Sequence, residues 1–219
     1  QSNLADTYFG RGNSPQSCGI VLTGNILTNT LNTRDVGAAA GSQVTNLNTS
    51  ETFCSIQAAI DDAQTLNGHV LNVASGTFNE SVVINKEVTI KGNGGSPNTR
   101  PIVEGVSGQS ISVTVPNVTI DNIIVKFNQG TVNTGIRAVT SGSFNNLTVK
   151  NSRIYGTAAT GVVIFGSFGL QLGTAGGALS DQVTLDSNEI THTGTSPLGR
   201  GVRTNNCYGD WKNSRINGY

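Results

Sequence analysis

The segment FCSIQAAIDDAQTLNGHVLNVASGTFNESVVINKEVTIKGNG, residues 53–94, decides the fold of this chain. It opens with an amphipathic pattern, in which apolar residues recur at i, i+3, i+4 and i+7: Ile56, Ala59, Ile60 and Ala63. Thr52 or Ser55 could cap the N-terminus of this helix. A helix of about three turns is unstable alone in water, so we expect it to cover the open end of an apolar core.

Three short strands follow the helix in the same segment. They are expected at residues 69–74, 81–84 and 88–91, and each ends in a polar or Gly-containing turn. The turns leave no room for crossover helices. Each strand should therefore pair with the next coil of the chain, as in a parallel solenoid.

An internal repeat extends this pattern through the rest of the chain. Each copy has an apolar pair at i and i+2, a polar turn residue at i+4 and an apolar residue at i+7. The copies begin near Val118, Leu147, Val183 and Gly209. The predicted turn column is Gly92, Asn122, Asn151, Ser187 and Asn213. Asn tolerates the left-handed backbone conformation, so the column should form a ladder along one corner.

A second strand follows each turn residue, expected at residues 135–139, 161–165 and 201–204. The long separation between Asn151 and Ser187 indicates an inserted loop, which we place at residues 167–180. The sequence therefore predicts an all-β, right-handed parallel β-helix with a short N-terminal capping helix. Residues 1–50 form an irregular segment packed on the cap, and residues 51–219 form a β-helix truncated at its C-terminal end.

Composition sets limits on the partners. Gly, Asn, Thr and Ser make up close to half of the chain, only 12% of residues are charged, and the net charge is zero. This balance argues against nucleic acid and anionic membranes as partners, and no apolar run approaches membrane-spanning length. The last repeat copy stops before its second strand, so we expect further coils or an oligomer partner to cover that end.

The cysteines and sequons favour an extracellular or cell-surface location. The chain has no Met and begins at Gln1, as a processed protein would. Cys18 and Cys54 flank the irregular N-terminal segment, and we predict a disulfide between them, which leaves Cys207 unpaired or bonded elsewhere. The alternative is three buried free thiols, and no pair has metal-site spacing. Four glycosylation sequons begin at Asn48, Asn79, Asn117 and Asn146, although an Asn- and Thr-rich chain produces such matches by chance.

The runs SIQAAIDDAQ and VLNVASGTFNESVVINKEVTIKGNG resemble the N-terminal cap and first coil of the pectin-lyase-like β-helix superfamily. They are similar to the opening of pectin methylesterases and of bacterial surface β-helix proteins. The resemblance implies a β-helix that binds or cleaves polysaccharide. Pectin methylesterases use a catalytic Asp in a strand that ends Ile-Phe-Gly. Residues 161–166 keep that ending and have no carboxylate.

A pectate-type lyase would need an acidic calcium cluster facing an Arg or Lys base. The weak candidates for this catalytic set are Asp181, Asp186, Glu189, Arg200 and Arg203. In the repeat frame Lys150 lies between Asp121 and Asp186, which indicates an exposed ladder of alternating charge. Solvated surface roles are thus the favoured interpretation of these residues. We expect no cofactor and no metal, and calcium only if the chain is a lyase.

Binding of a polysaccharide or cell-surface glycan would use exposed aromatic rings. The weak candidates are Tyr155, Phe168 and Tyr208, with Phe168 in the inserted loop. Trp211 shares the inward column of Ile120, Val149 and Leu185, so we expect it in the core. Three hypotheses stay open: a non-catalytic secreted or cell-surface scaffold that binds carbohydrate or mediates adhesion, a polysaccharide lyase, and a purely structural or oligomerisation module.

Overall fold

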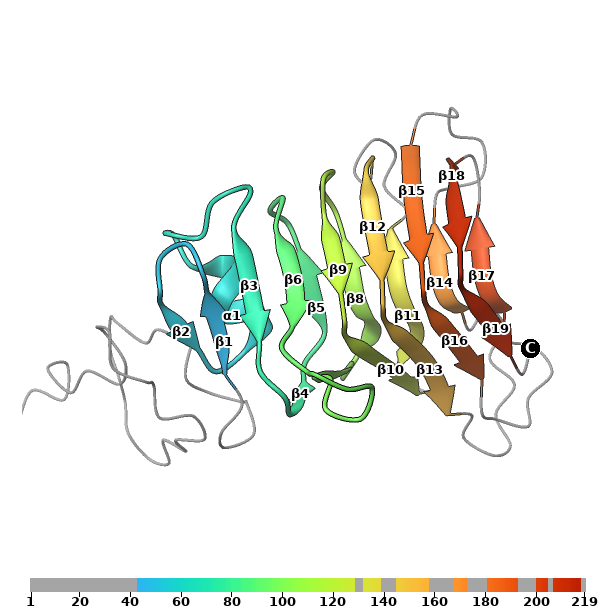
Figure 1. Ribbon diagram of the computed structural model, residues 1–219, viewed down its shortest axis with the longest axis horizontal. Helices are drawn as coiled ribbons and strands as arrows, with labels where there is room; N and C mark the ends of the chain where they lie inside the picture. Colours follow the sequence, from blue (N-terminus) through green and yellow to red (C-terminus); the bar gives the residue numbers. More distant parts are fainter. Residues whose placement is uncertain are drawn as a thin grey trace, which may run out of the picture.

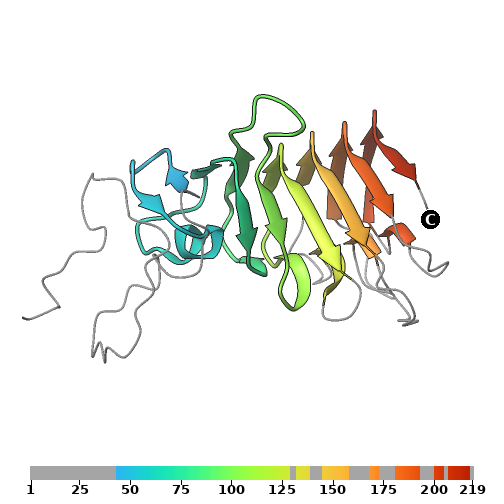
Figure 2. The same ribbon diagram turned by 90° about the horizontal axis from the view of Figure 1, so that it is seen from below.

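The computed structural model describes residues 43–128, 132–138, 145–157, 168–172, 181–192, 200–204 and 207–217. Over these ranges the chain contains one short helix and nineteen strands, most of them in parallel sheets. Figure 1 shows the strands stacked side by side along the long axis of the molecule, and Figure 2 shows the same stacking from below. The prediction of a parallel β-helix is confirmed.

Each complete turn of the chain contributes one strand to each of three sheets. The parallel strands of sheet 1 are β3 (Val70–Val73), β6 (Thr89–Gly92), β9 (Thr119–Asp121), β12 (Leu147–Lys150), β15 (Asp181–Asp186) and β18 (Cys207–Lys212). Sheet 2 contains β4 (Thr77–Asn79), β7 (Ile102–Glu104), β10 (Ile124–Asn128), β13 (Arg153–Thr157), β16 (Glu189–His192) and β19 (Arg215–Asn217). Sheet 3 contains β5 (Val82–Ile84), β8 (Gly108–Val113), β11 (Val132–Ala138), β14 (Phe168–Leu172) and β17 (Arg200–Thr204).

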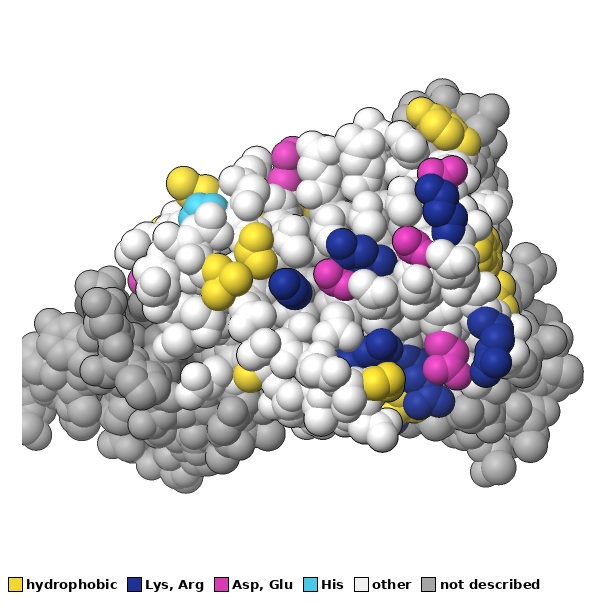
Figure 3. Space-filling model, in the orientation of Figure 1, with side chains coloured by type: hydrophobic (Ala, Val, Ile, Leu, Met, Phe, Trp, Pro, Cys, Tyr) yellow, Lys and Arg dark blue, Asp and Glu magenta, His cyan; other side chains and the backbone are white. Residues whose placement is uncertain are grey.

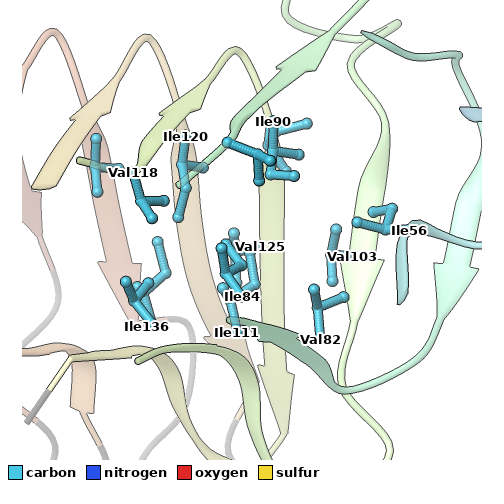
Figure 4. Close-up of a cluster of buried hydrophobic side chains, with 14 of the residues drawn as sticks. Ile56, Val82, Ile84, Ile90, Val103, Ile111, Val118, Ile120, Val125 and Ile136 are labelled. Carbon is cyan, nitrogen blue, oxygen red and sulfur yellow. The ribbon is translucent and has the colours of Figure 1, made fainter. Parts of the chain in front are cut away.

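The registers of sheet 1 match the predicted repeat frame. Ile120 pairs with Val149, and Val149 pairs with Leu185. Because side chains alternate between the two faces of a strand, these residues all point inward and are buried. Figure 4 shows the interior as a column of aliphatic side chains drawn from all three sheets, with Ile90, Ile120 and Val125 among them. Burial of this column is the main source of stability.

The N-terminal end is built differently from the repeat. Strands β1 (Val44–Asn46) and β2 (Thr52–Phe53), which the sequence did not predict, extend sheet 1 with antiparallel pairing. Helix α1 (Ile56–Asp61) follows, with Ser55 as the N-cap and a buried apolar side that joins the core. The helix is shorter than predicted because Asp62 leaves the helical conformation. Ala63, expected on the apolar stripe, is therefore outside the helix and exposed.

The predicted corner ladder is present. Asn122, Asn151, Ser187 and Asn213 all have positive φ, between 49° and 59°. Gly92 occupies this column because of close packing, not because of a positive φ. A Cβ at Gly92 would lie 2.1 Å from the Asn122 carbonyl oxygen, so close approach of the two corners requires glycine there. The sequence missed a second ladder at the start of sheet 1, where Asn117 and Asn146 also have positive φ.

Two local predictions are wrong. Residues 168–172, placed in an inserted loop, form strand β14, which pairs with β11 so that Leu170 lies opposite Ile136. The segment at 161–165, predicted to occupy this place, lies outside the described residues. Residues 75–77 were expected to be a turn only, yet β4 begins at Thr77 and buries Phe78. In both places the strand is short and adjoins Gly and Ser residues, which the sequence pattern indicates as turns.

Trp211 lies in the predicted column, opposite Leu185. It is nevertheless 45% exposed, contrary to the expectation of a core residue. The reason is that β18 is the outermost strand of sheet 1 among the described residues, so no described coil covers it. Cys54 is buried, whereas Cys18 lies outside the described ranges, and the bridge between them stays a prediction.

Candidate functional site

The three aromatic candidates do not form one site. Tyr155 lies in β13 of sheet 2, Phe168 begins β14 of sheet 3, and Tyr208 lies in β18 of sheet 1. The three residues therefore belong to three different sheets. Tyr208 is 54% exposed on β18, the outermost described strand of sheet 1. Tyr155 lies in the interior of sheet 2, on β13 between β10 and β16.

The acidic candidates are engaged in structural contacts. Asp186, at the end of β15, accepts hydrogen bonds from Asn213 Nδ2 at 3.1 Å and from Ser187 Oγ at 2.9 Å. The hydrogen bond from Asn213, followed by the one from Ser187, lowers the pKa of Asp186. Asp186 therefore stays ionised near neutral pH and links successive corners, which does not suit a general acid.

Glu189 follows Asp186 across a single corner. It therefore lies in sheet 2, whereas Asp186 lies in sheet 1. Its Oε2 lies 3.4 Å from Arg153 Nε, and its Oε1 accepts a hydrogen bond from Thr191 Oγ1 at 3.2 Å. Asp181 begins β15, while Arg200 and Arg203 belong to β17. In the described part of the chain no group of three or more His, Cys, Asp or Glu side chains could hold a metal ion.

The charge ladder predicted around Lys150 is confirmed on the outer face of sheet 1. The paired row runs Lys91, Asp121, Lys150, Asp186 and Lys212. Lys150 Nζ lies 3.6 Å from Asp121 Oδ2. Figure 3 shows basic and acidic side chains alternating across this face. This alternating row is better suited to fixing the register between coils than to binding a ligand, because each charged side chain already has a neighbour of opposite charge.

The outer face of sheet 2 has a different character. Strand alternation turns Phe78, Val103, Val125, Ile154 and Ile190 inward, where they are buried. The outward side chains of β7, β10, β13, β16 and β19 then form two ranks. We call this surface the tyrosine face, and it comprises Glu104, Lys126, Arg153, Tyr155, Glu189, Thr191 and Arg215.

Tyr155 is the centre of the tyrosine face. The Arg153 guanidinium carbon lies 5.1 Å from the centroid of the Tyr155 ring, in a cation–π contact. Lys126 and Thr191 are the paired neighbours of Tyr155 on either side along the rank. An aromatic ring is thus flanked by a cation, a hydroxyl and a guanidinium.

Ion pairs hold the charged residues of this face partly in place. Lys126 Nζ lies 2.6 Å from Glu104 Oε1. Arg153 Nε is close to Glu189 but makes no aligned hydrogen bond with the described residues. Since Arg215 is also exposed, the face carries three cations and two carboxylates. Such a surface can offer donors to hydroxyl and carboxylate groups while an aromatic ring packs on the apolar side of a sugar.

The repeat frame could have found most of this face. Lys126, Tyr155 and Thr191 each follow a turn residue of the corner ladder by four positions, and Arg153, Glu189 and Arg215 each follow one by two. Among these residues Tyr155 alone is a predicted ligand-binding residue, as an exposed aromatic ring.

Glu80 is a half-buried charged group that the sequence did not indicate. Its two carboxylate oxygens accept hydrogen bonds from the backbone N–H groups of Ile56 at 2.7 Å and Gln57 at 2.9 Å. Burial raises the pKa of Glu80, while these two hydrogen bonds oppose the rise. Glu80 ties the first turn of α1 to the first coil, which is a structural role.

Comparison with known proteins finds a relative over part of the chain. No family model matches the chain, and no solved structure matches it. A curated protein named cell surface glycoprotein, from Methanothermus fervidus, is 34% identical over 122 residues, which cover 55% of this chain. The chain spans only 19% of the length of that relative. The likeness to the pectin-lyase-like superfamily therefore stays a resemblance. Among the described residues, α1 is far too short to span a membrane, and no other helix could do so.

Proposed function

We propose that the chain is a non-catalytic cell-surface scaffold whose tyrosine face binds polysaccharide. The partial relative is named for the cell surface, which supports an extracellular or cell-surface location for this chain as well. Tyr155, stacked with Arg153 and flanked by Lys126, is the observation that carries the binding proposal. Three cations against two carboxylates favour an acidic glycan over a neutral one.

A glycan array and titration calorimetry on the full chain test this proposal. Wild-type protein should bind an acidic polysaccharide, such as a polyuronate, and Tyr155→Ala should weaken that binding about tenfold, as the loss of one stacking contact worth about 1.4 kcal/mol would. Tyr208→Ala is the matched control, since it removes an exposed ring from a different sheet. Equal affinity of wild type and Tyr155→Ala would overturn the assignment of the face, and no binding of any glycan at millimolar concentration would overturn the function.

Adhesion between cells could use the same face, with a glycan of a neighbouring cell as the ligand. The lyase alternative has less support, because Asp186 and Glu189 are both engaged with other side chains. The same samples decide the matter. A rise in absorbance at the wavelength of unsaturated uronates, dependent on calcium and lost in Asp186→Ala, would replace the scaffold by an enzyme.

A further inference from the structure

The four sequons differ in ways that the sequence does not show. All four asparagines are exposed, whereas the buried asparagines Asn46 and Asn188 are outside sequons. Exposure alone does not make an acceptor. Transfer of a glycan needs an amide nitrogen that can reach the sugar donor, and a hydroxyl two residues later that the transferase can recognise. The surroundings of each side chain therefore decide among the sequons.

Two of the four sequons belong to the corner of sheet 1. Asn146 Nδ2 donates to Asn117 Oδ1 at 3.0 Å, and Asn117 Nδ2 donates to Glu87 Oε2 at 3.1 Å. Both sequons run directly into strands, β9 and β12. The two nitrogens lie on successive rungs, about 4.8 Å apart along the stack. Each nitrogen is thus engaged, and each sequon is fixed in a ladder.

The sequon at Asn79 is restricted by its hydroxyl. Ser81 Oγ accepts hydrogen bonds from the N–H groups of Val106 and Ser107, and it donates to the Ser107 carbonyl oxygen at 2.8 Å. The middle residue of this sequon is Glu80, whose carboxylate accepts two hydrogen bonds from the first turn of α1. A transferase could not bind this segment without breaking the contact between the first coil and the helix.

The sequon at Asn48 lies wholly in the turn between β1 and β2. Asn48 Oδ1 accepts a hydrogen bond from the Val70 N–H at 2.9 Å, which orients the side chain. Among the described residues the amide nitrogen of Asn48 has no acceptor, and the hydroxyl of Ser50 has no hydrogen-bond partner. Both residues are exposed. Of the four sequons, this is the one in which the amide nitrogen and the hydroxyl two residues later are both available in the folded chain.

We infer that Asn48 is an N-glycosylation site and that Asn117 and Asn146 are not. The donor is an oligosaccharide linked through a diphosphate to a lipid, supplied with its transferase by the cell. The Asn48 Nδ2 forms a bond to the anomeric carbon of the sugar and gives up one proton. The bond from that carbon to the phosphate oxygen breaks, and the lipid diphosphate leaves. The inference does not rest on the tyrosine face, which belongs to another sheet.

Glycopeptide mass spectrometry of the full chain, secreted by a eukaryotic host that modifies sequons, tests the inference. The peptide containing Asn48 should carry a glycan in most molecules, while those containing Asn117 and Asn146 should be unmodified. Ser50→Gly should abolish the Asn48 glycan without unfolding the chain, because Ser50 has a φ of 62° that suits glycine. Thr49→Ser is the matched control: it changes the middle residue of the same sequon, leaves Asn48 and Ser50 in place, and should keep the glycan.

Two outcomes would overturn the inference. One is an unmodified Asn48 in a chain whose circular dichroism shows the β fold. The other is equal glycan occupancy at Asn48 and at Asn146. That result would mean that glycan transfer precedes folding and that the ladder contacts do not determine which asparagine is modified. Glycan binding by the tyrosine face can be measured on the Ser50→Gly variant, so a failure of one proposal is separable from a failure of the other.

Discussion

Gly156 is a position at which an added side chain would collide with a core aromatic ring. It pairs with Phe127 of the preceding coil, and a Cβ added to Gly156 would lie 2.4 Å from Phe127 Cε2. The Phe127 ring is only 1% exposed and belongs to the central core cluster, so it cannot move aside freely. Overpacking of this kind commonly costs a folded domain about 1–3 kcal/mol.

We therefore expect Gly156→Ala to lower the free energy of unfolding by about 1–3 kcal/mol, as measured by urea denaturation and far-ultraviolet circular dichroism. The double variant Gly156→Ala, Phe127→Leu should recover part of this loss, because the smaller side chain makes space for the new methyl group. Strictly additive effects in this cycle would show that the two residues do not compete for the same space.

Glu80 gives a second prediction, which concerns pH. The pKa of Glu80 is raised from 4.5 by burial in the folded chain, so the folded chain binds the proton more readily than the unfolded chain does. The stability gained in this way is fully present below pH 4.5 and is lost as the pH rises through the folded pKa. Protonation of Glu80 thus favours the fold.

The measurement is the free energy of unfolding of wild type minus that of Glu80→Gln, followed from pH 7 down to pH 4.5. This difference should grow in favour of wild type as the pH falls, since Gln cannot take up the proton. Subtraction removes the titration of the other carboxylates. A difference that is constant across this range would contradict the raised pKa of Glu80.

At the scale of elements, the corners between sheets 1 and 2 hold the solenoid in register. Asn151 has a φ of 51°, and its Nδ2 donates to Asp121 Oδ1 at 2.9 Å. In the next corners, Asn213 Nδ2 makes the equivalent bond to Asp186 Oδ1. The left-handed conformation costs a residue with a Cβ about 1–2 kcal/mol, and the side-chain bond of Asn offsets that cost.

Asn151→Ala should therefore lower the melting temperature more than Asn151→Gly does. Both variants lose the bond to Asp121, but only alanine keeps the strain of the positive φ. Thermal unfolding followed by circular dichroism compares the two. If glycine proves as damaging as alanine, the hydrogen bond rather than the backbone conformation accounts for the preference for Asn.

The sequence predicts the corners correctly because their residues form a ladder from coil to coil. Left-handed corners favour Asn or Gly and recur once in each coil, so the sequence alone predicts the column at Asn122, Asn151 and Asn213. Strand β14 was misplaced because residues 161–165 and 168–172 are both short apolar runs beside glycine, and local pattern does not choose between them. The ion pair between Glu104 and Lys126 was not predicted because Glu104 follows its turn residue, Gly92, by twelve positions, whereas Lys126 follows Asn122 by four.

At the scale of the whole molecule, the charge row on sheet 1 links successive coils. Lys150 lies between Asp121 and Asp186, so Lys150→Glu would place three carboxylates on neighbouring strands. Like charges directly opposite one another destabilise a sheet by roughly 0.2–1 kcal/mol per pair. We expect Lys150→Glu to cost about 1 kcal/mol at low salt, as measured by urea denaturation.

High salt should reduce that loss, because exposed charges are screened over a few ångströms in 1 M salt. Lys150→Gln is the matched control: it removes the attraction and adds no repulsion, so its cost should be smaller and less sensitive to salt. A loss from Lys150→Glu that is the same at low and high salt would indicate a packing defect, not a charge effect.

Trp211 is the single tryptophan of the chain, and it sits half-exposed on the outermost described strand of sheet 1. In a solenoid each rung is held only by its neighbours, so rungs at the margin open more easily than those in the middle. The intrinsic fluorescence of Trp211 therefore reports on the outermost described coil rather than on the middle of the solenoid. We expect the emission of Trp211 to shift at lower denaturant than the backbone dichroism does, which makes one native side chain a built-in reporter of how unfolding spreads inward.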